Sequence, residues 1–184
     1  MHVPAPSAPL IRKTDVFVVA TDGADLLNVT STEFQNEFYA CWSSDASMLF
    51  VQRETNQLIA VGLGSDDGTL VALGEVPVAE GLPSATSFSW VRSGGGTVLC
   101  YSTNESGRFR VVTLEVAASD PPQVLTRSTS GEERWASFGP GDQRLAFCRS
   151  GSGSTAGIFT INADGTGETR IASRGTDPCW RRTP

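Results

Sequence analysis

The chain has 184 residues, of which 39% are hydrophobic and 18% are charged, and its formal net charge is −6. This length suits a single domain with its own hydrophobic core. The shortage of clustered Lys and Arg argues against nucleic acid or an anionic membrane surface as the main partner, because binding phosphates requires such clusters.

Residues 1–14 are predicted to form a flexible lead-in, and residues 15–184 a single domain. Residues 3–9 are rich in Pro, Ala and Ser, a composition typical of extended linkers. No apolar run reaches the roughly 18 residues that span a bilayer, and no stretch near the start resembles a signal peptide. We therefore expect a soluble protein without membrane insertion; its compartment is unknown, and a periplasmic or secreted origin stays open.

The single histidine, His2, lies in this lead-in. Ser-His-Asp and Cys-His catalytic systems need a histidine that a rigid scaffold holds in place. We therefore expect no catalytic residues and predict that the protein is not an enzyme. The same reasoning argues against a histidine-rich metal site.

The first predicted elements are two strands within VFVVATDGADLLNVTS (residues 16–31), joined by an Asp-Gly turn. A repeat follows, because the aromatic residues Trp42, Trp90, Phe138 and Trp180 recur at separations of 48, 48 and 42 residues. Units of about 40 to 50 residues are typical of propeller blades.

Each of the first three anchors is followed by a polar turn and three short strands separated by polar loops. The expected strands are MLFV, QLIAVGL and LVALGE; TVLCY, RFRVVTL and QVLTR; and RLAFC, GIFTIN and TRIAS. With the anchor strand, each unit has four antiparallel strands, as in a propeller blade. The pairs Asp22–Gly23, Asp67–Gly68 and Asp164–Gly165 favour tight hairpin turns, which need a positive φ.

The units resemble the TolB-type β-propeller repeat, a relative of the WD-repeat blade. The residues that carry the resemblance are CWSSDASMLFVQ, SFGPGDQRLAFC, VFVVATDGADLLNVT and GIFTINADGTGETRIAS. The resemblance covers about residues 15–182 and is weak in the second unit, where VRSGGG replaces the usual turn. It implies an all-β propeller of four-stranded antiparallel blades, and these motifs carry no catalytic residue.

The two ends of the repeat complement one another. LIRKTDVFVVATDG supplies the later strands of a blade, and DPCWRRTP supplies the tryptophan strand. We therefore predict four blades, one of which is shared between the N- and C-terminal segments. Two alternatives stay open: a homodimer that forms an eight-bladed ring, and a fragment of a larger propeller.

The remaining motifs give no cofactor or metal site. The four cysteines are expected to be small core residues: Cys100 and Cys148 align with Val51, and Cys41 and Cys179 each precede an anchor tryptophan. Cys41 and Cys179 also form the pair to check for a disulfide. The Gly-rich loops lack a phosphate-binding layout. The adjacent acidic residues Asp66–Asp67 and Glu132–Glu133 point to opposite faces of a strand and are expected to be solvated.

In propellers, ligands usually meet the face that carries the blade-to-blade loops and the loops after the second strand. On this face we expect residues 33–39, 82–86, 131–135, 175–177, 52–56, 103–108 and 150–155. Trp135 beside Arg134 is the strongest candidate pair, because Trp, Tyr and Arg are enriched at interface hot spots. The further candidates on this face are Tyr39, Glu37, Asp177, Arg53 and Arg108. An alternative interpretation is that Trp135 and Tyr39 pack between blades.

The sequence therefore predicts a non-enzymatic propeller that binds a protein or peptide across one face, as a monomer or homodimer. The alternative is a lectin-like propeller that binds carbohydrate or another small ligand between blades.

Overall fold

The chain is all β over the residues that the computed structural model describes, which are 13–43, 46–80, 86–93, 96–104, 107–116 and 120–180. Its helical content there is one short 3₁₀ turn, η1 (Gly153–Thr155). Most of the predicted lead-in, His2 and most of the expected loop at residues 82–86 lie outside the described residues. The all-β prediction is confirmed.

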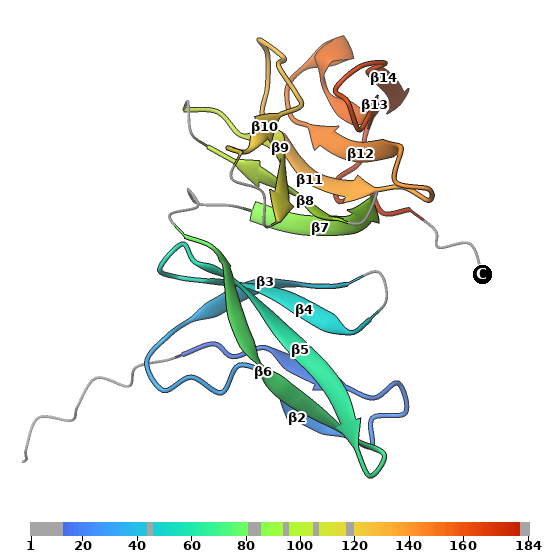
Figure 1. Cartoon of the computed structure of the whole chain (residues 1–184). Helices are drawn as coiled ribbons and strands as arrows, with labels where there is room; N and C mark the ends of the chain where they lie inside the picture. The colour runs from blue at the N-terminus through green and yellow to red at the C-terminus, as the bar shows by residue number, and fades with distance from the viewer. Residues whose placement is uncertain are drawn as a thin grey trace, which may run out of the picture.

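The strands form one two-stranded hairpin and three four-stranded antiparallel sheets, which we call the first, second and third blade (Figure 1). The hairpin consists of β1 (Phe17–Val19) and β2 (Leu26–Asn28). The first blade consists of β3 (Glu37–Trp42), β4 (Met48–Arg53), β5 (Leu58–Asp66) and β6 (Thr69–Ala79). The second consists of β7 (Thr86–Ser93), β8 (Gly96–Thr103), β9 (Arg110–Val116) and β10 (Gln123–Val124). The third consists of β11 (Glu133–Phe138), β12 (Arg144–Arg149), β13 (Gly157–Asn162) and β14 (Thr169–Ala172).

The three predicted Asp-Gly turns join β1 to β2, β5 to β6, and β13 to β14. Their glycines, Gly23, Gly68 and Gly165, have φ values of 76°, 83° and 82°. Residues other than glycine rarely adopt this backbone conformation. Asp67 also has a positive φ of 48°, as the first central residue of a two-residue hairpin turn requires. The turn chemistry read from the sequence is confirmed.

Apolar clusters lie between successive sheets, because the blades carry apolar side chains on both faces. Within β8, Leu99 and Tyr101 pack with Phe50 toward the first blade, whereas Cys100 packs with Phe147 toward the third. This alternation follows from the period of two along a strand. It also explains why the strands of this sequence are apolar at consecutive positions.

The two ends of the series formed by the hairpin and the three blades differ in structure. The hairpin packs one face on the first blade through Val18, Leu27 and Val29. Its other face leaves Phe17, Val19 and Leu26 more than half exposed. The hairpin pairs only within itself among the described residues.

At the other end, residues 173–180 lie on the outer face of the third blade. The Trp180 indole lies 2.9 Å from where a Cβ of Gly139 would sit, and its Nε1 donates to the Ser137 carbonyl at 3.0 Å. The hairpin and Trp180 thus lie against different blades, with the second blade between these two. The shared blade expected from the two ends stays a prediction.

All four cysteines are free. Cys100 and Cys148 are buried, as expected, and the Cys41–Cys179 disulfide is not formed. Burial raises the pKa of the Cys41 thiol to about 12. Cys179 is exposed.

A membrane crossing would need a helix far longer and more apolar than any in the described residues.

We predict that Trp180→Ala lowers the free energy of unfolding by about 2 kcal/mol, less than for a fully buried tryptophan because the ring is half exposed. Trp180→Phe keeps a ring against Gly139 and loses only the bond to Ser137, which costs about 1 kcal/mol. Urea unfolding measures both variants. An unchanged midpoint for Trp180→Ala would show that this end of the chain does not hold the third blade.

Candidate functional site

The candidate surface lies at the end of the blades where β3 and β11 begin and where β4, β8 and β12 end. We call it the loop end. On the second and third blades it consists of residues 107–110, 125–136, 148–157 and 172–177. The strand register fixes this arrangement, because Arg134 lies opposite Cys148, Cys148 opposite Ile158, and Ile158 opposite Ala172.

A repeated β-bulge shapes this end. Tyr39, Trp135 and Asp177 each stand three residues before an aromatic anchor, and their φ values are 48°, 55° and 49°. The register shifts between Phe38 and Cys41 in β3, and between Arg134 and Ser137 in β11. Such bulges re-aim side chains, and non-glycine residues with positive φ are strained. The repeat therefore places a strained residue at the same point of the first unit, the third unit and the terminal segment.

These three residues with positive φ differ in their surroundings. Tyr39 is exposed on the first blade, and its ring centroid lies 6.4 Å from that of Phe38. Trp135 is half-buried on the third blade. Asp177 is exposed, and its charge adds to burial in raising the pKa of Cys148, which places it beside the third blade.

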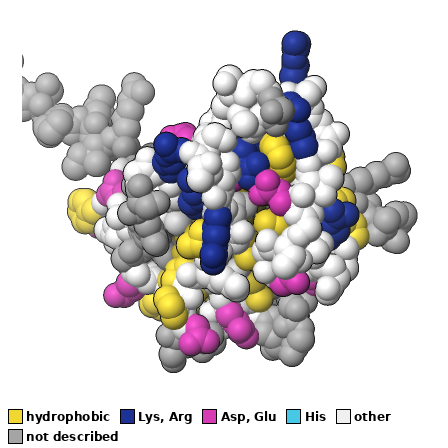
Figure 2. All heavy atoms as spheres, turned by 90° about the horizontal axis from the view of Figure 1, so that it is seen from above, with side chains coloured by type: hydrophobic (Ala, Val, Ile, Leu, Met, Phe, Trp, Pro, Cys, Tyr) yellow, Lys and Arg dark blue, Asp and Glu magenta, His cyan; other side chains and the backbone are white. Residues whose placement is uncertain are grey.

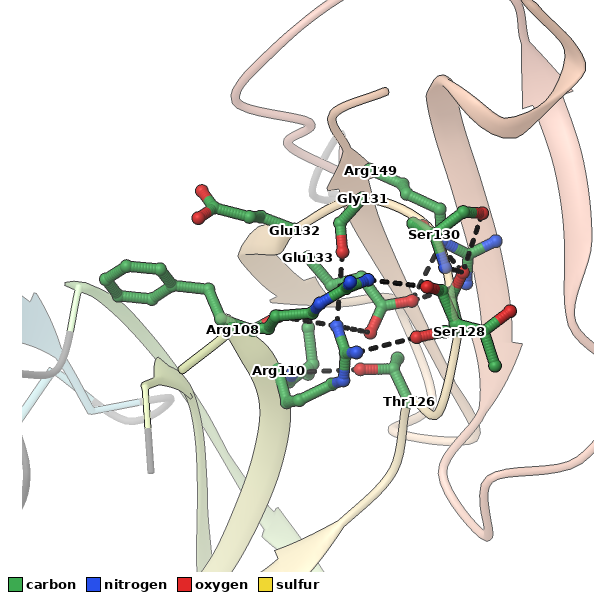
Figure 3. Close-up of polar contacts among 12 residues, drawn as sticks. Arg108, Arg110, Thr126, Ser128, Ser130, Gly131, Glu132, Glu133 and Arg149 are labelled. Carbon is green, nitrogen blue, oxygen red and sulfur yellow. Dashed lines mark hydrogen bonds and ion pairs between the residues drawn. The ribbon is translucent and has the colours of Figure 1, made fainter. Parts of the chain in front are cut away.

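Arg134 of the third blade stacks on Phe109, which precedes β9 of the second blade. The Arg134 guanidinium carbon lies 3.4 Å from the Phe109 ring centroid, and its Nη2 donates to Glu132 Oε2 at 2.8 Å. Arg108 donates from Nη1 to the Thr129 carbonyl, as Figure 3 shows. Of the predicted residues, Arg134 thus stacks on Phe109, and Arg108 and Trp135 are the chain neighbours of this pair.

Beneath this surface lies a buried ion cluster centred on Glu133, whose exposed fraction is 0% (Figure 3). Arg149 Nε donates to Glu133 Oε1 at 2.8 Å, and Arg110 Nη1 donates to Oε2 at 3.3 Å. Arg149 also forms two bonds of 2.8 and 2.7 Å to Glu168. The expectation that Glu133 is solvated is wrong, because two arginines compensate its charge inside the protein.

Hydrogen bonds, opposite charges and an aromatic ring together stabilise the charged form of Arg149. Burial disfavours the charged form, but hydrogen bonds from Arg149 to Glu168 and Glu133, together with their charges, outweigh that cost. The pKa of Arg149 is therefore raised above its ordinary value. Its guanidinium carbon also lies 4.3 Å from the Phe159 ring centroid.

The first blade repeats this arrangement. Glu37 is 3% exposed, and Arg53 Nε lies 3.5 Å from its Oε1. Arg53 also donates to Glu75 at 3.0 and 2.6 Å. As a correction to the sequence prediction, the side chains of Glu37 and Arg53 are internal and cannot meet a partner on the surface. The identical 16-residue spacing from Glu to Arg in both units could have shown this.

A cavity of about 560 Å³ lies beside the loop at residues 127–129, between β10 and the third blade. Its lining combines the buried Arg149 and the exposed Glu168 with Arg127, Asp164 and a floor that includes Leu125 and Ile161. Hydrogen bonds from Thr166 lower the pKa of Asp164. Figure 2, which looks down on the side carrying β10, β13 and β14, shows basic and acidic side chains close together around hydrophobic ones.

Within the described ranges, no group of three or more His, Cys, Asp or Glu side chains lies close enough together to hold a metal ion.

Two solved structures share this arrangement of strands. The chain matches a putative TolB from Agrobacterium tumefaciens with a TM-score of 0.63 and 18% identity, over 89% of this chain and 56% of that one. It matches an oligogalacturonate lyase from Vibrio parahaemolyticus with a TM-score of 0.61 and 14% identity, over 88% and 46%. The chain has a TolB-like propeller fold. This confirms the resemblance predicted from the repeat.

The chain also matches an oligogalacturonate lyase in complex with manganese, with a TM-score of 0.58 and 16% identity, over 88% of this chain and 46% of that one. The chain spans about half the length of these solved structures. No protein-family model and no curated protein matches it. At such identities the likeness concerns the fold alone.

We predict that Glu133→Gln lowers the free energy of unfolding by about 3 kcal/mol, because it leaves the buried Arg149 and the half-buried Arg110 without their shared carboxylate. Glu132→Gln is the matched control: its half-exposed carboxylate pairs with Arg134 alone, and we expect a loss below about 1 kcal/mol. Chemical denaturation compares the two. Equal losses would contradict the central place given to Glu133.

Proposed function

We propose that the chain is a non-enzymatic binding module that recognises a protein or peptide at the loop end of its second and third blades. The observation that carries the proposal is the Arg134–Phe109 stack beside Trp135. Aromatic and arginine side chains supply most of the binding energy at protein interfaces. Here a bulge in β11 sets the direction of Trp135, and Glu132 and Phe109 hold Arg134 in place.

Preorganisation supports the same proposal. Arg110 Nη2 donates to the Ser128 carbonyl at 2.6 Å, and Glu133 anchors Arg110 from below. The loop at residues 127–132 is therefore fixed before a partner arrives. A side chain that is already ordered loses little conformational entropy on binding, so more of its contact energy contributes to affinity. Tyr39 and Asp177 would extend the surface on either side.

We expect Trp135→Ala and Phe109→Ala each to weaken partner binding about tenfold or more, because they remove aromatic contacts at the centre of the surface. The matched control is Phe34→Ala, which truncates a 70% exposed aromatic residue before the first blade. The intact chain and its variants would be used to capture partners from a lysate, and each partner's affinity would be measured by interferometry. Capture that is equal for Trp135→Ala and Phe34→Ala would reject the surface.

A second candidate function rests on the cavity. Its volume of about 560 Å³ falls in the range of small-ligand sites, and it has hydroxyl, amide, carboxylate and guanidinium groups over an apolar floor. These groups suit the hydroxyls of a neutral saccharide. A glycan array tests this candidate, with Gln123→Ala and Arg127→Ala expected to remove any signal. An array without signal would reject it.

The four-bladed ring with one shared blade belongs to the proposal as well. The segment at residues 173–180 would begin the shared blade, and the β1–β2 hairpin would supply its outer strands. Ring closure would cover Phe17, Val19 and Leu26, which are exposed on the hairpin. A second copy of the chain is the alternative source of that cover.

A further inference from the structure

We propose that the partner presents a short acidic peptide segment to the loop end of the second and third blades; this rests on the proposed function and names the chemistry of its partner. The chain as a whole has a net charge of −6. The described residues of this surface nevertheless carry more cations than anions. The cations are Arg108, Arg110, Arg127, Arg134, Arg149 and Arg174, and the anions are Glu132, Glu133 and Asp177.

The buried part of this charge is already balanced. Arg110 and Arg149 face Glu133, and Glu168 reaches Arg149 from the third blade. Two cations, the buried Glu133 and the exposed Glu168 thus compensate one another. The positive excess therefore belongs to the outer arginines.

The outer arginines are available for new bonds. Arg108, Arg127 and Arg174 are exposed, and the side chain of Arg134 is 27% exposed. Among the described contacts, Arg108 uses one donor on Thr129, and Arg134 uses Nε and Nη2 on Glu132. A guanidinium has five donors in a planar fork that matches a carboxylate. Each of these side chains can thus take a partner carboxylate without giving up its present bond.

The opposite end of the same blades has the opposite charge. Glu115, Asp120 and Asp142 lie there, with Arg144 as the one described arginine among them. A partner with acidic side chains is therefore attracted to one end of the blades and repelled from the other. Charge complementarity of this kind steers association and fixes orientation.

A peptide fits this surface better than a long polyanion. The arginines are few and are interleaved with Phe109 and Trp135, and Glu132 stands among them. A segment that alternates acidic and apolar side chains could match that order. A long polyanion would meet the acidic remainder of the chain.

The test uses the full chain and three fluorescein-labelled peptides of twelve residues, alternating Leu with Glu, Gln or Lys. We expect fluorescence anisotropy to show binding of the Glu peptide at least about tenfold tighter than the other two, and weaker at higher salt. Arg108→Glu and Arg134→Glu should each weaken it by about tenfold or more. Arg144→Glu is the matched control, because it makes the same charge change on an exposed arginine at the opposite end of the third blade.

Several outcomes would overturn the proposal: equal binding of the three peptides, an equal effect of Arg144→Glu, or tighter binding of polygalacturonate than of the Glu peptide. Arg134→Glu also removes the stack on Phe109 and can therefore destabilise the fold. If its melting temperature is lowered, the result for Arg108→Glu is the one that tests the proposal. If Trp135→Ala loses the captured partner but Arg108→Glu keeps it, the acidic chemistry is wrong and the docking function stands. If neither variant changes capture, the proposed function itself fails.

Discussion

The structure depends on one carboxylate that is completely removed from water. An ionised group inside a protein is costly unless charges and hydrogen bonds compensate it. Glu133 obtains this compensation from Arg149 of its own blade and from Arg110 of the preceding blade. This pairing fixes the second blade against the third, and it supports the loop that carries Glu132 and leads to Arg134 and Trp135. The candidate surface therefore owes its shape to an interaction below it.

The first blade also contains a buried carboxylate, and partly different groups compensate its charge. Glu37 is again paired with the arginine at the end of the second strand, Arg53. Toward the preceding sheet, the hydroxyls of Thr30 and Thr32 donate to its two oxygens at 3.3 and 2.8 Å. In both blades a buried glutamate at the start of the innermost strand thus joins its own blade to the sheet before it. Neutral hydroxyls serve at one junction and a second arginine at the other.

Much of the fold was predictable because local chemistry encodes it. The aromatic anchors, the Asp-Gly turns and the short apolar runs are signals that neighbouring residues carry together. The candidate site was predictable only in part. Trp135, Arg134 and Arg108 were predicted from their positions in the repeat, and their role in binding stays a prediction. Phe109, on whose ring Arg134 stacks, carries no local signal. Glu37, Arg53 and Glu133 were predicted at the surface because a charged residue is expected to be solvated unless a compensating partner is known. Such a partner can be distant in the sequence, since Arg110 lies 23 residues before Glu133.

Each sheet is built from strands that are consecutive in the chain, and each apolar cluster joins only neighbouring sheets. Such an array behaves as a one-dimensional series of coupled units, in which stability is a sum of the units and their junctions. The second blade then acts as the sole mechanical link between the first and third within the described chain. A defect at Leu99 or Tyr101 would uncouple the N-terminal part while the Glu133 junction stayed intact, so the two sides of the second blade can unfold in separate steps.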